Sequence, residues 1–284
     1  MKHFTHSICC FTAALALAAP VFAVDGVTLI NQATVQGAGG FPYIISQSGS
    51  YRLSGNLVAA STSAISITAP NVTLDLNGFT ISCTGCTAAQ QPGIGGSQPG
   101  TEILNGTVTG FNNSDCIDTG TNARLDHVTM SQCEAGVAAA SGAGDLTVLN
   151  STISGTLGNG VYGAHVSVVN TMIGGYNNDG ILAATATVSN STIVGGFGTQ
   201  GIVISASGVV SGNTITGGNT GIYVEAGAAA TITNNSISGV ILGVQTAGSA
   251  VVGSNAFAGN TNDFGTTTLA VSQHNNVCSN HNGC

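Results

Sequence analysis

The carboxylates between residues 111 and 134 are the first group in this chain whose types and spacing could do chemistry. Residues 111–118 read FNNSDCID, which places Asp115 and Asp118 three positions apart, and Glu134 follows in the stretch SQCEAGVAA. Carboxyl groups about 6.5–9.5 Å apart can serve as acid and base in the inverting hydrolysis of a glycosidic bond. The three side chains are therefore our candidate catalytic residues. No cofactor is expected, and calcium is the metal that their oxygens could hold.

A structural role for the same carboxylates has to be weighed against catalysis. Ile117 falls in a column of inward apolar residues, so Cys116 and Asp118 are expected to point outward. Residues three apart on a strand face opposite sides, and Asp115 is expected at the turn before the strand. The two aspartates are then not a side-by-side pair, and the sequence favours surface aspartates beside a disulfide.

Two tyrosines form a second candidate site, for ligand binding. The outward positions that follow the Gly-Ile pattern run Asp118, Ala138, Tyr162, Leu182, Val203, Tyr223, Gln245. If each belongs to its own coil, Tyr162 and Tyr223 lie three coils and about 14 Å apart. Flat aromatic faces can stack on sugar rings, so Tyr162, Tyr223 and Asp118 are our candidate ligand-binding residues. The alternative is that both tyrosines are scattered surface residues.

Six cysteines remain after the N-terminal segment, and an even count in an exported chain favours disulfides. They are Cys83, Cys86, Cys116, Cys133, Cys278 and Cys284. CTGC at residues 83–86 could instead serve redox or zinc chemistry. It has no strand–helix context and no second close pair, so a structural bridge is favoured. A Cys278–Cys284 loop would tie down the last coil.

Charge and composition narrow the classes of partner. Only 5% of residues are charged, with three Lys and Arg against eleven Asp and Glu, and 43% are hydrophobic. Disorder usually requires high charge and low hydrophobicity. Binding to nucleic acid or to an anionic membrane requires basic residues that this chain lacks. The composition therefore indicates a folded protein without a nucleic-acid partner.

The N-terminus has the pattern of a targeting segment. Lys2 precedes the apolar run FTAALALAAPV, and the small residues around Ala23 fit cleavage after that position. We expect residues 1–23 to be a signal peptide, and hence a secreted, periplasmic or cell-surface protein. No stretch is long enough to span a bilayer.

Repetition at intervals of about 20 to 23 residues, apart from a longer first interval, is the main structural signal. One column of apolar residues runs Ile81, Val108, Met130, Ile153, Ile173, Ile193, Ile215, Ile237, Phe257. A second column runs Ile117, Val137, Val161, Ile181, Ile202, Ile222, Val244. Alternation within each short segment indicates strands with one buried side. Such a period is typical of stacked coils in which each strand pairs with its equivalent in the next coil.

Asparagine marks the turn before the first of these columns. Asn tolerates the left-handed backbone better than other non-glycine residues, and stacked amides can hydrogen-bond along the axis. His127 occupies the same column and is expected to be a turn residue. The asparagines predicted to play this scaffold role are Asn105, Asn150, Asn170, Asn190, Asn213 and Asn235.

The repeats with G-I-x-V and N-x-T-I strands resemble the right-handed parallel β-helix of the pectin-lyase-like superfamily over roughly residues 60–262. That fold carries lyases, hydrolases, epimerases, adhesins and binding proteins, so the resemblance implies no particular reaction. FNNSDCID also resembles the N-x-D-G-I-D segment of polygalacturonase-type hydrolases. The other acidic pair, Gly-His-Gly and Arg-x-Lys of that family are missing here.

Arg124 is the only basic residue that a polysaccharide lyase could use as its base. Aligning the coils places Asp75, Glu102 and Arg124 in one outward column. A Glu102–Arg124 ion pair across neighbouring strands is then the favoured role, and it would contribute about 0.2–1 kcal/mol at the surface.

We therefore predict an all-β, right-handed parallel β-helix of about nine to ten coils. Residues 24–60 are expected to form an N-terminal cap and first coil, 61–262 the repeats, and 263–284 a C-terminal cap or tail. The favoured function is a non-catalytic glycan-binding or structural protein outside the cytoplasm. The alternatives are a polysaccharide hydrolase or lyase that uses the carboxylates near residues 115–134, and an adhesin or assembly protein. The oligomeric state is left open.

Overall fold

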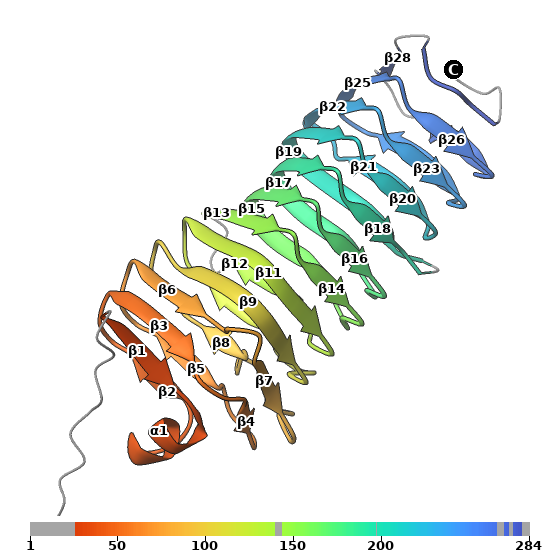
Figure 1. The fold of residues 1–284 in the computed structure, drawn as a ribbon. Helices are drawn as coiled ribbons and strands as arrows, with labels where there is room; N and C mark the ends of the chain where they lie inside the picture. Colours follow the sequence, from red (N-terminus) through yellow and green to blue (C-terminus); the bar gives the residue numbers. More distant parts are fainter. Residues whose placement is uncertain (1–25, 140–143, 197, 266–269, 273–274, 280–284) are drawn as a thin grey trace, which may run out of the picture.

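The chain is wound into a solenoid of parallel strands (Figure 1). The structure is a computed structural model that describes residues 26–139, 144–196, 198–265, 270–272 and 275–279. Within them, 28 strands join in one sheet of about 11 turns. The predicted all-β parallel β-helix is confirmed, with slightly more coils than the nine to ten expected. The predicted signal peptide lies outside the described residues.

Three faces run along the solenoid, and each complete coil after the first contributes one strand segment to each face. We call them faces A, B and C in chain order. Face A contains the first halves of β9 and β11, the second halves of β15, β17 and β19, and seven complete strands: β1 (Val27–Ile30), β3 (Gly49–Leu53), β6 (Val72–Asp75), β13 (Asp145–Leu149), β22 (Ala229–Thr233), β25 (Ser249–Gly253) and β28 (Ala270–Ser272).

Five longer strands turn the corner between two faces. They are β9 (Glu102–Thr109), β11 (Ala123–Ser131), β15 (Val161–Val169), β17 (Asp179–Ser189) and β19 (Gln200–Ser211). The second halves of β9 and β11 lie on face B, and the first halves of β15, β17 and β19 lie on face C.

Faces B and C are built mainly from short strands. Face B adds β4 (Leu57–Ala59), β7 (Thr80–Cys83), β14 (Thr152–Ser154), β16 (Met172–Gly174), β18 (Thr192–Val194), β20 (Thr214–Thr216), β23 (Ser236–Ser238) and β26 (Ala256–Ala258). Face C adds β2 (Tyr43–Ile45), β5 (Ile65–Ile67), β8 (Ile94–Gly95), β10 (Ile117–Thr119), β12 (Val137–Ala139), β21 (Thr220–Val224), β24 (Leu242–Thr246) and β27 (Asn262–Gly265).

The core contains the two apolar columns that the sequence predicts, together with a third on face A that the sequence analysis missed, from Leu74 to Val252. Ile153, Ile173, Ile193 and Ile215 pair in register on face B, and all four are fully buried. The column on face C, from Ile117 to Val244, is buried in the same way. Alternation along each strand therefore decides which side chains face the axis.

The turns between faces A and B confirm part of the predicted asparagine column. Asn105, Asn150, Asn170 and Asn190 have positive φ, and so does His127 at 57°. Asn213 and Asn235 do not, so the prediction of a left-handed turn was wrong for these two. There Gly212 and Asn234 take the left-handed position, with φ of 70° and 58°.

Because the left-handed residue lies one position earlier in these two coils, the side chains of Asn213 and Asn235 point into the core. Each amide donates to the next along the axis, from Asn213 to Asn235 at 3.0 Å and from Asn235 to Asn255 at 3.0 Å. We call these three buried residues the inner amide ladder. The predicted hydrogen bonding along the axis is therefore present at the inward position, and it also occurs in the outer column, where the amide of Asn170 donates to Oδ1 of Asn150 at 3.3 Å.

A single short helix, α1 (Gln32–Gly37), interrupts the solenoid in the described residues. It replaces the face-B strand of the first coil, between β1 and β2, at the N-terminal end (Figure 1). Asn31 caps it by accepting hydrogen bonds from two backbone N–H groups, and Val35 is fully buried. The described residues contain no helix of the length and apolar character that a membrane span requires.

Candidate functional site

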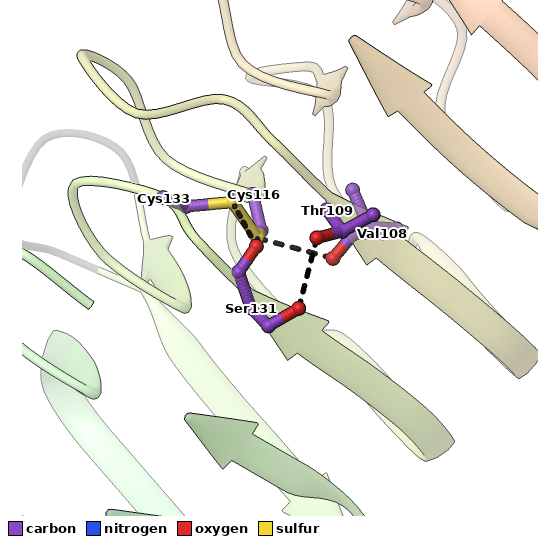
Figure 2. The surroundings of a disulfide bond; sticks show 5 residues. All are labelled: Val108, Thr109, Cys116, Ser131 and Cys133. Carbon is purple, nitrogen blue, oxygen red and sulfur yellow. Dashed lines mark hydrogen bonds between the residues drawn. A yellow bond between two sulfur atoms is a disulfide. The ribbon is translucent and has the colours of Figure 1, made fainter. Parts of the chain in front are cut away.

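A disulfide fixes the backbone around the candidate carboxylates. Cys116 and Cys133 are bonded, which joins two successive coils at the corner before face C (Figure 2). Asp115 and Glu134 are the residues directly next to these two cysteines. The cross-link therefore sets the positions of two of the three predicted acidic side chains.

Cys116 departs from the sequence-based expectation. It was expected to face outward, yet its side chain is fully buried, and its sulfur lies 3.3 Å from the carbonyl oxygen of Val108. Beside it the hydroxyls of Thr109 and Ser131 share a hydrogen bond of 2.9 Å (Figure 2). The alternation rule fails at this position because Cys116 belongs to the corner, before β10 begins at Ile117.

The other cysteines bear on the predicted bridges. Cys83 and Cys86 form a disulfide, so the predicted bridge within CTGC is present. The expected Cys278–Cys284 loop falls partly outside the described residues.

Asp115 has the most perturbed of the three candidate carboxyl groups. Its burial, together with the nearby charges of Asp118 and Glu134, raises its pKa to about 6, although a backbone hydrogen bond from Ala135 favours the ionised form. The negative charges of Asp118 and Glu134 thus add to the effect of burial on this carboxyl group. A carboxyl group with a pKa near neutrality has the property of a general acid.

Asp118 lies on face C, between Gly95 of one neighbouring strand and Ala138 of the other. A Cβ added to Gly95 would lie only 2.7 Å from Pro92, so the Pro92 ring covers this part of the face. Burial raises the pKa of Asp118, and its Oδ1 atom has no hydrogen-bond partner within the described residues. Asp118 is therefore partly buried, with the Pro92 ring beside it on the neighbouring coil.

Glu134 is exposed, in the turn before β12. Its backbone N–H donates to the carbonyl of Ser114, and a Cβ on Gly158 would lie 3.0 Å from its Oε1 atom. Across the residues that the structure describes, no three His, Cys, Asp or Glu side chains are grouped so that they could hold a metal ion. The three carboxylates thus form no metal cage with other described side chains.

The predicted Glu102–Arg124 ion pair is present on face A. The guanidinium contacts Glu102 and Asp126, both at 2.6 Å. Although burial opposes it, hydrogen bonds from Asn150 and Arg124 lower the pKa of Asp126. Arg124 is held between two carboxylates, which is a structural role and not that of a free base.

Asp75 was wrongly placed in the column of Glu102 and Arg124. Glu102 pairs with Thr73, whereas Asp75 pairs with Leu104 and bonds Arg52 at 3.0 Å. The sequence alignment of coils was therefore displaced by two residues at this point.

The outward stripe on face C has the predicted register. Asp118, Ala138, Tyr162, Leu182, Val203, Tyr223 and Gln245 are successive partners in neighbouring strands. Tyr162 is 43% exposed, whereas Val203 is only 2% exposed although it points outward. Solvent exposure thus varies along the stripe, and Tyr162 is an aromatic residue of the stripe that is exposed.

A hollow of about 290 Å³ lies at the end of face C, where the chain turns toward face A. Tyr162 and Leu182 form one wall, and Ser205 and Glu225 contribute a hydroxyl and a carboxylate. Ala164 and Ala184 also line the hollow, and their side chains are too small to fill it. Tyr223 is not among the lining residues. We call this site the Tyr162–Glu225 hollow.

Sequence reasoning singled out Tyr162 but missed Ser205 and Glu225. Both follow the last residues that pair in face C, Ile204 and Val224. The chain also contains one more residue at this corner in β19 than in β17, which shifts the register. The available signal for Glu225 is its position directly after the G-I-x-V pattern, which ends at Val224.

Comparison with known proteins supplies a fold but no family. No protein-family model matches the chain, and neither does any curated protein. Among solved structures it is similar to the crystal structure of Dettilon tailspike protein (gp208), with a TM-score of 0.60 and 14% sequence identity. The two share a β-helix fold. The match covers 82% of this chain and 55% of the tailspike chain, and at this identity it shows the fold alone.

Proposed function

We propose that this chain is an exported β-helix protein that binds a neutral polysaccharide without cleaving it. The Tyr162–Glu225 hollow is the observation that carries the proposal. It combines an exposed aromatic ring with a carboxylate and a hydroxyl across a shallow space of about 290 Å³. An aromatic face stacks on the apolar side of a sugar ring, and carboxylate oxygens accept hydrogen bonds from sugar hydroxyls.

Charge supports a neutral polymer over an acidic one. The chain has a formal net charge of −8, and Arg124 is already held by Glu102 and Asp126. A uronate polymer would be repelled by such a surface, because the long-range potential has the same sign as the ligand. A neutral glycan meets no such repulsion and is selected by stacking and hydrogen bonds.

Export is supported by the disulfides and by the N-terminal pattern. Cys83–Cys86 and Cys116–Cys133 are cross-links of the kind that persist in oxidising compartments. The targeting pattern of residues 1–23 points the same way. A glycan-binding protein is also useful where polysaccharides are found, outside the cytoplasm.

Hydrolysis is the second candidate function, and the pKa of about 6 at Asp115 is the observation that favours it. In that case Asp115 would protonate the leaving oxygen, and Glu134 or Asp118 would act as base or nucleophile. Against it, Pro92 covers the face next to Asp118. We therefore rank binding above hydrolysis.

The test is a panel of polysaccharides that scores both retention and release of reducing ends. We expect the purified protein to be retained by at least one neutral polysaccharide and to release no reducing ends. Tyr162→Ala should reduce retention strongly, because the aromatic wall is lost, with little change in thermal stability. Tyr223→Ala is the matched control outside the hollow and should have the smaller effect.

Two results would overturn the proposal. One is equal retention of the wild-type protein and of Tyr162→Ala on every polysaccharide that binds. The other is release of reducing ends that disappears in Asp115→Asn, which would establish the hydrolase instead.

A further inference from the structure

Face B has a regular outward surface that neither the proposed glycan site nor the scaffold explains. The first outward position of each strand from β7 to β23 is Thr80, Thr107, Thr129, Thr152, Met172, Thr192, Thr214 and Ser236. We call this row the threonine ladder. Each member pairs in register with the next, without a bulge, and Figure 1 shows the strands stacked along one side of the solenoid.

The hydroxyls of the threonine ladder are free to bind something outside the protein. None of them donates or accepts a side-chain hydrogen bond within the described part of the chain. Thr129, Thr192 and Thr214 are exposed, and Met172 is 49% exposed. Parallel to the ladder runs a second row with Thr109, Ser131, Ser154, Thr216 and Ser238.

The chemistry of face B excludes most classes of partner. From β7 to β26 its outward side chains include no aromatic ring and no charge. Protein interfaces are enriched in aromatic residues and Arg and depleted in Ser, and face B offers no aromatic ring on which a sugar could stack. This surface fits an uncharged ligand that forms hydrogen bonds with the hydroxyls and leaves room for the threonine methyl groups.

The spacing of the ladder points to ordered water. Neighbouring strands place equivalent backbone positions about 4.7–4.9 Å apart, and hydroxyls repeat at the same distance where their side chains share one rotamer. Two oxygens that are bonded to one tetrahedral water at about 2.75 Å lie about 4.5 Å from each other. The ladder therefore repeats along the axis at nearly the distance between second-neighbour oxygens in ice. The χ1 angle of Thr is stiff, so its hydroxyls and methyls are held in place before binding.

From this match of spacing, neutrality and unpaired hydroxyls, we propose that face B binds ice. Its hydroxyls take the place of water oxygens in the outermost lattice layer, and its methyl groups lie in the gaps between them. The binding is a surface adsorption and includes no covalent step. It is independent of the Tyr162–Glu225 hollow, which lies at the corner between faces C and A.

The experiment uses the exported chain from residue 24 onward and measures thermal hysteresis together with partition into a growing ice front. The disruptive variant is Thr152→Lys with Thr192→Lys, two coils apart on face B. The matched control is Thr147→Lys with Thr187→Lys, two coils apart on face A in the same turns. Thermal unfolding of both variants checks their folding, and the single Thr192→Lys and Thr187→Lys replace the doubles if either fails to fold.

We expect wild type and the face-A control to show thermal hysteresis and to enter the ice. The face-B variant should lose most of both while it keeps its retention on polysaccharide. Absence of hysteresis in the wild-type protein, or equal activity of the two variants, would overturn the proposal. Loss of polysaccharide retention in the face-B variant alone would instead assign face B to the glycan. Because the glycan test uses Tyr162→Ala on face C, failure of one proposal is distinguishable from failure of the other.

Discussion

Asp115 is a carboxyl group for which folding makes ionisation costly. Its pKa of about 6, against an ordinary 3.8, means that the folded state binds the proton more tightly than the unfolded state does. The free energy of unfolding therefore falls as pH rises from about 4 to 6 and stays lower above that range. The shift corresponds to roughly 3 kcal/mol as an upper limit.

Asp115→Asn should remove this pH-dependent cost. We expect the variant to be more stable than wild type at pH 8, by up to roughly 3 kcal/mol, and nearly equal to it at pH 3.5. Urea unfolding at both pH values measures the difference. Asp145→Asn, at an exposed position, is the control. A variant that is less stable at pH 8, or shifted equally at both pH values, would contradict the assigned surroundings of Asp115.

The facing of single residues could be predicted inside strands but not at corners. Ile117 and Tyr162 follow the alternation of side chains along a strand, and both lie as expected. Cys116 and Glu225 lie just outside paired segments, where the chain turns and alternation no longer applies. The sequence therefore indicated the aromatic wall of the hollow and missed its carboxylate.

At the scale of the elements, the turn between faces A and B shows that a shift by one position along the chain changes the role of an asparagine. Asn190 has the left-handed backbone and an exposed side chain, whereas Asn213 is buried and bonds Val188, Ser211 and Asn235. In sequence Asn190 lies three residues before its column residue, Ile193, whereas Asn213 lies only two residues before Ile215. A shift by one position flips a side chain to the other face, so the spacing to the column residue is the sequence signal that separates the two roles.

Asn213→Ala should destabilise the fold strongly. It leaves the buried backbone N–H of Ser191 without its partner, Oδ1 of Asn213, and it interrupts the inner amide ladder. Unpaired buried polar groups cost about 1–3 kcal/mol each, so we expect a loss on the order of 2–4 kcal/mol in chemical denaturation. Asn190→Gly should change stability by less than about 1 kcal/mol, since glycine accepts positive φ. Similar losses in the two variants would contradict the distinction between the positions.

The whole molecule is a stack in which every surface discussed depends on coil-to-coil register. The sequence predicted the fold because the apolar columns repeat at nearly constant intervals, and a solenoid is the arrangement that buries them all. It did not predict α1, because a six-residue helix gives too short a pattern. It also misplaced Asp75, because the interval from β6 to β9 is longer than the others.

The most direct test of this register is the distance between two spin labels on face B. Thr129→Cys and Ser236→Cys place the labels five coils apart, which predicts a backbone separation of about 24 Å. A pulsed electron paramagnetic resonance measurement on the doubly labelled, purified protein gives this distance. A single narrow distribution near that value agrees with a continuous stack. A broad distribution, or a mean displaced by more than the length of the label linkers, would contradict the solenoid and with it both proposed binding faces.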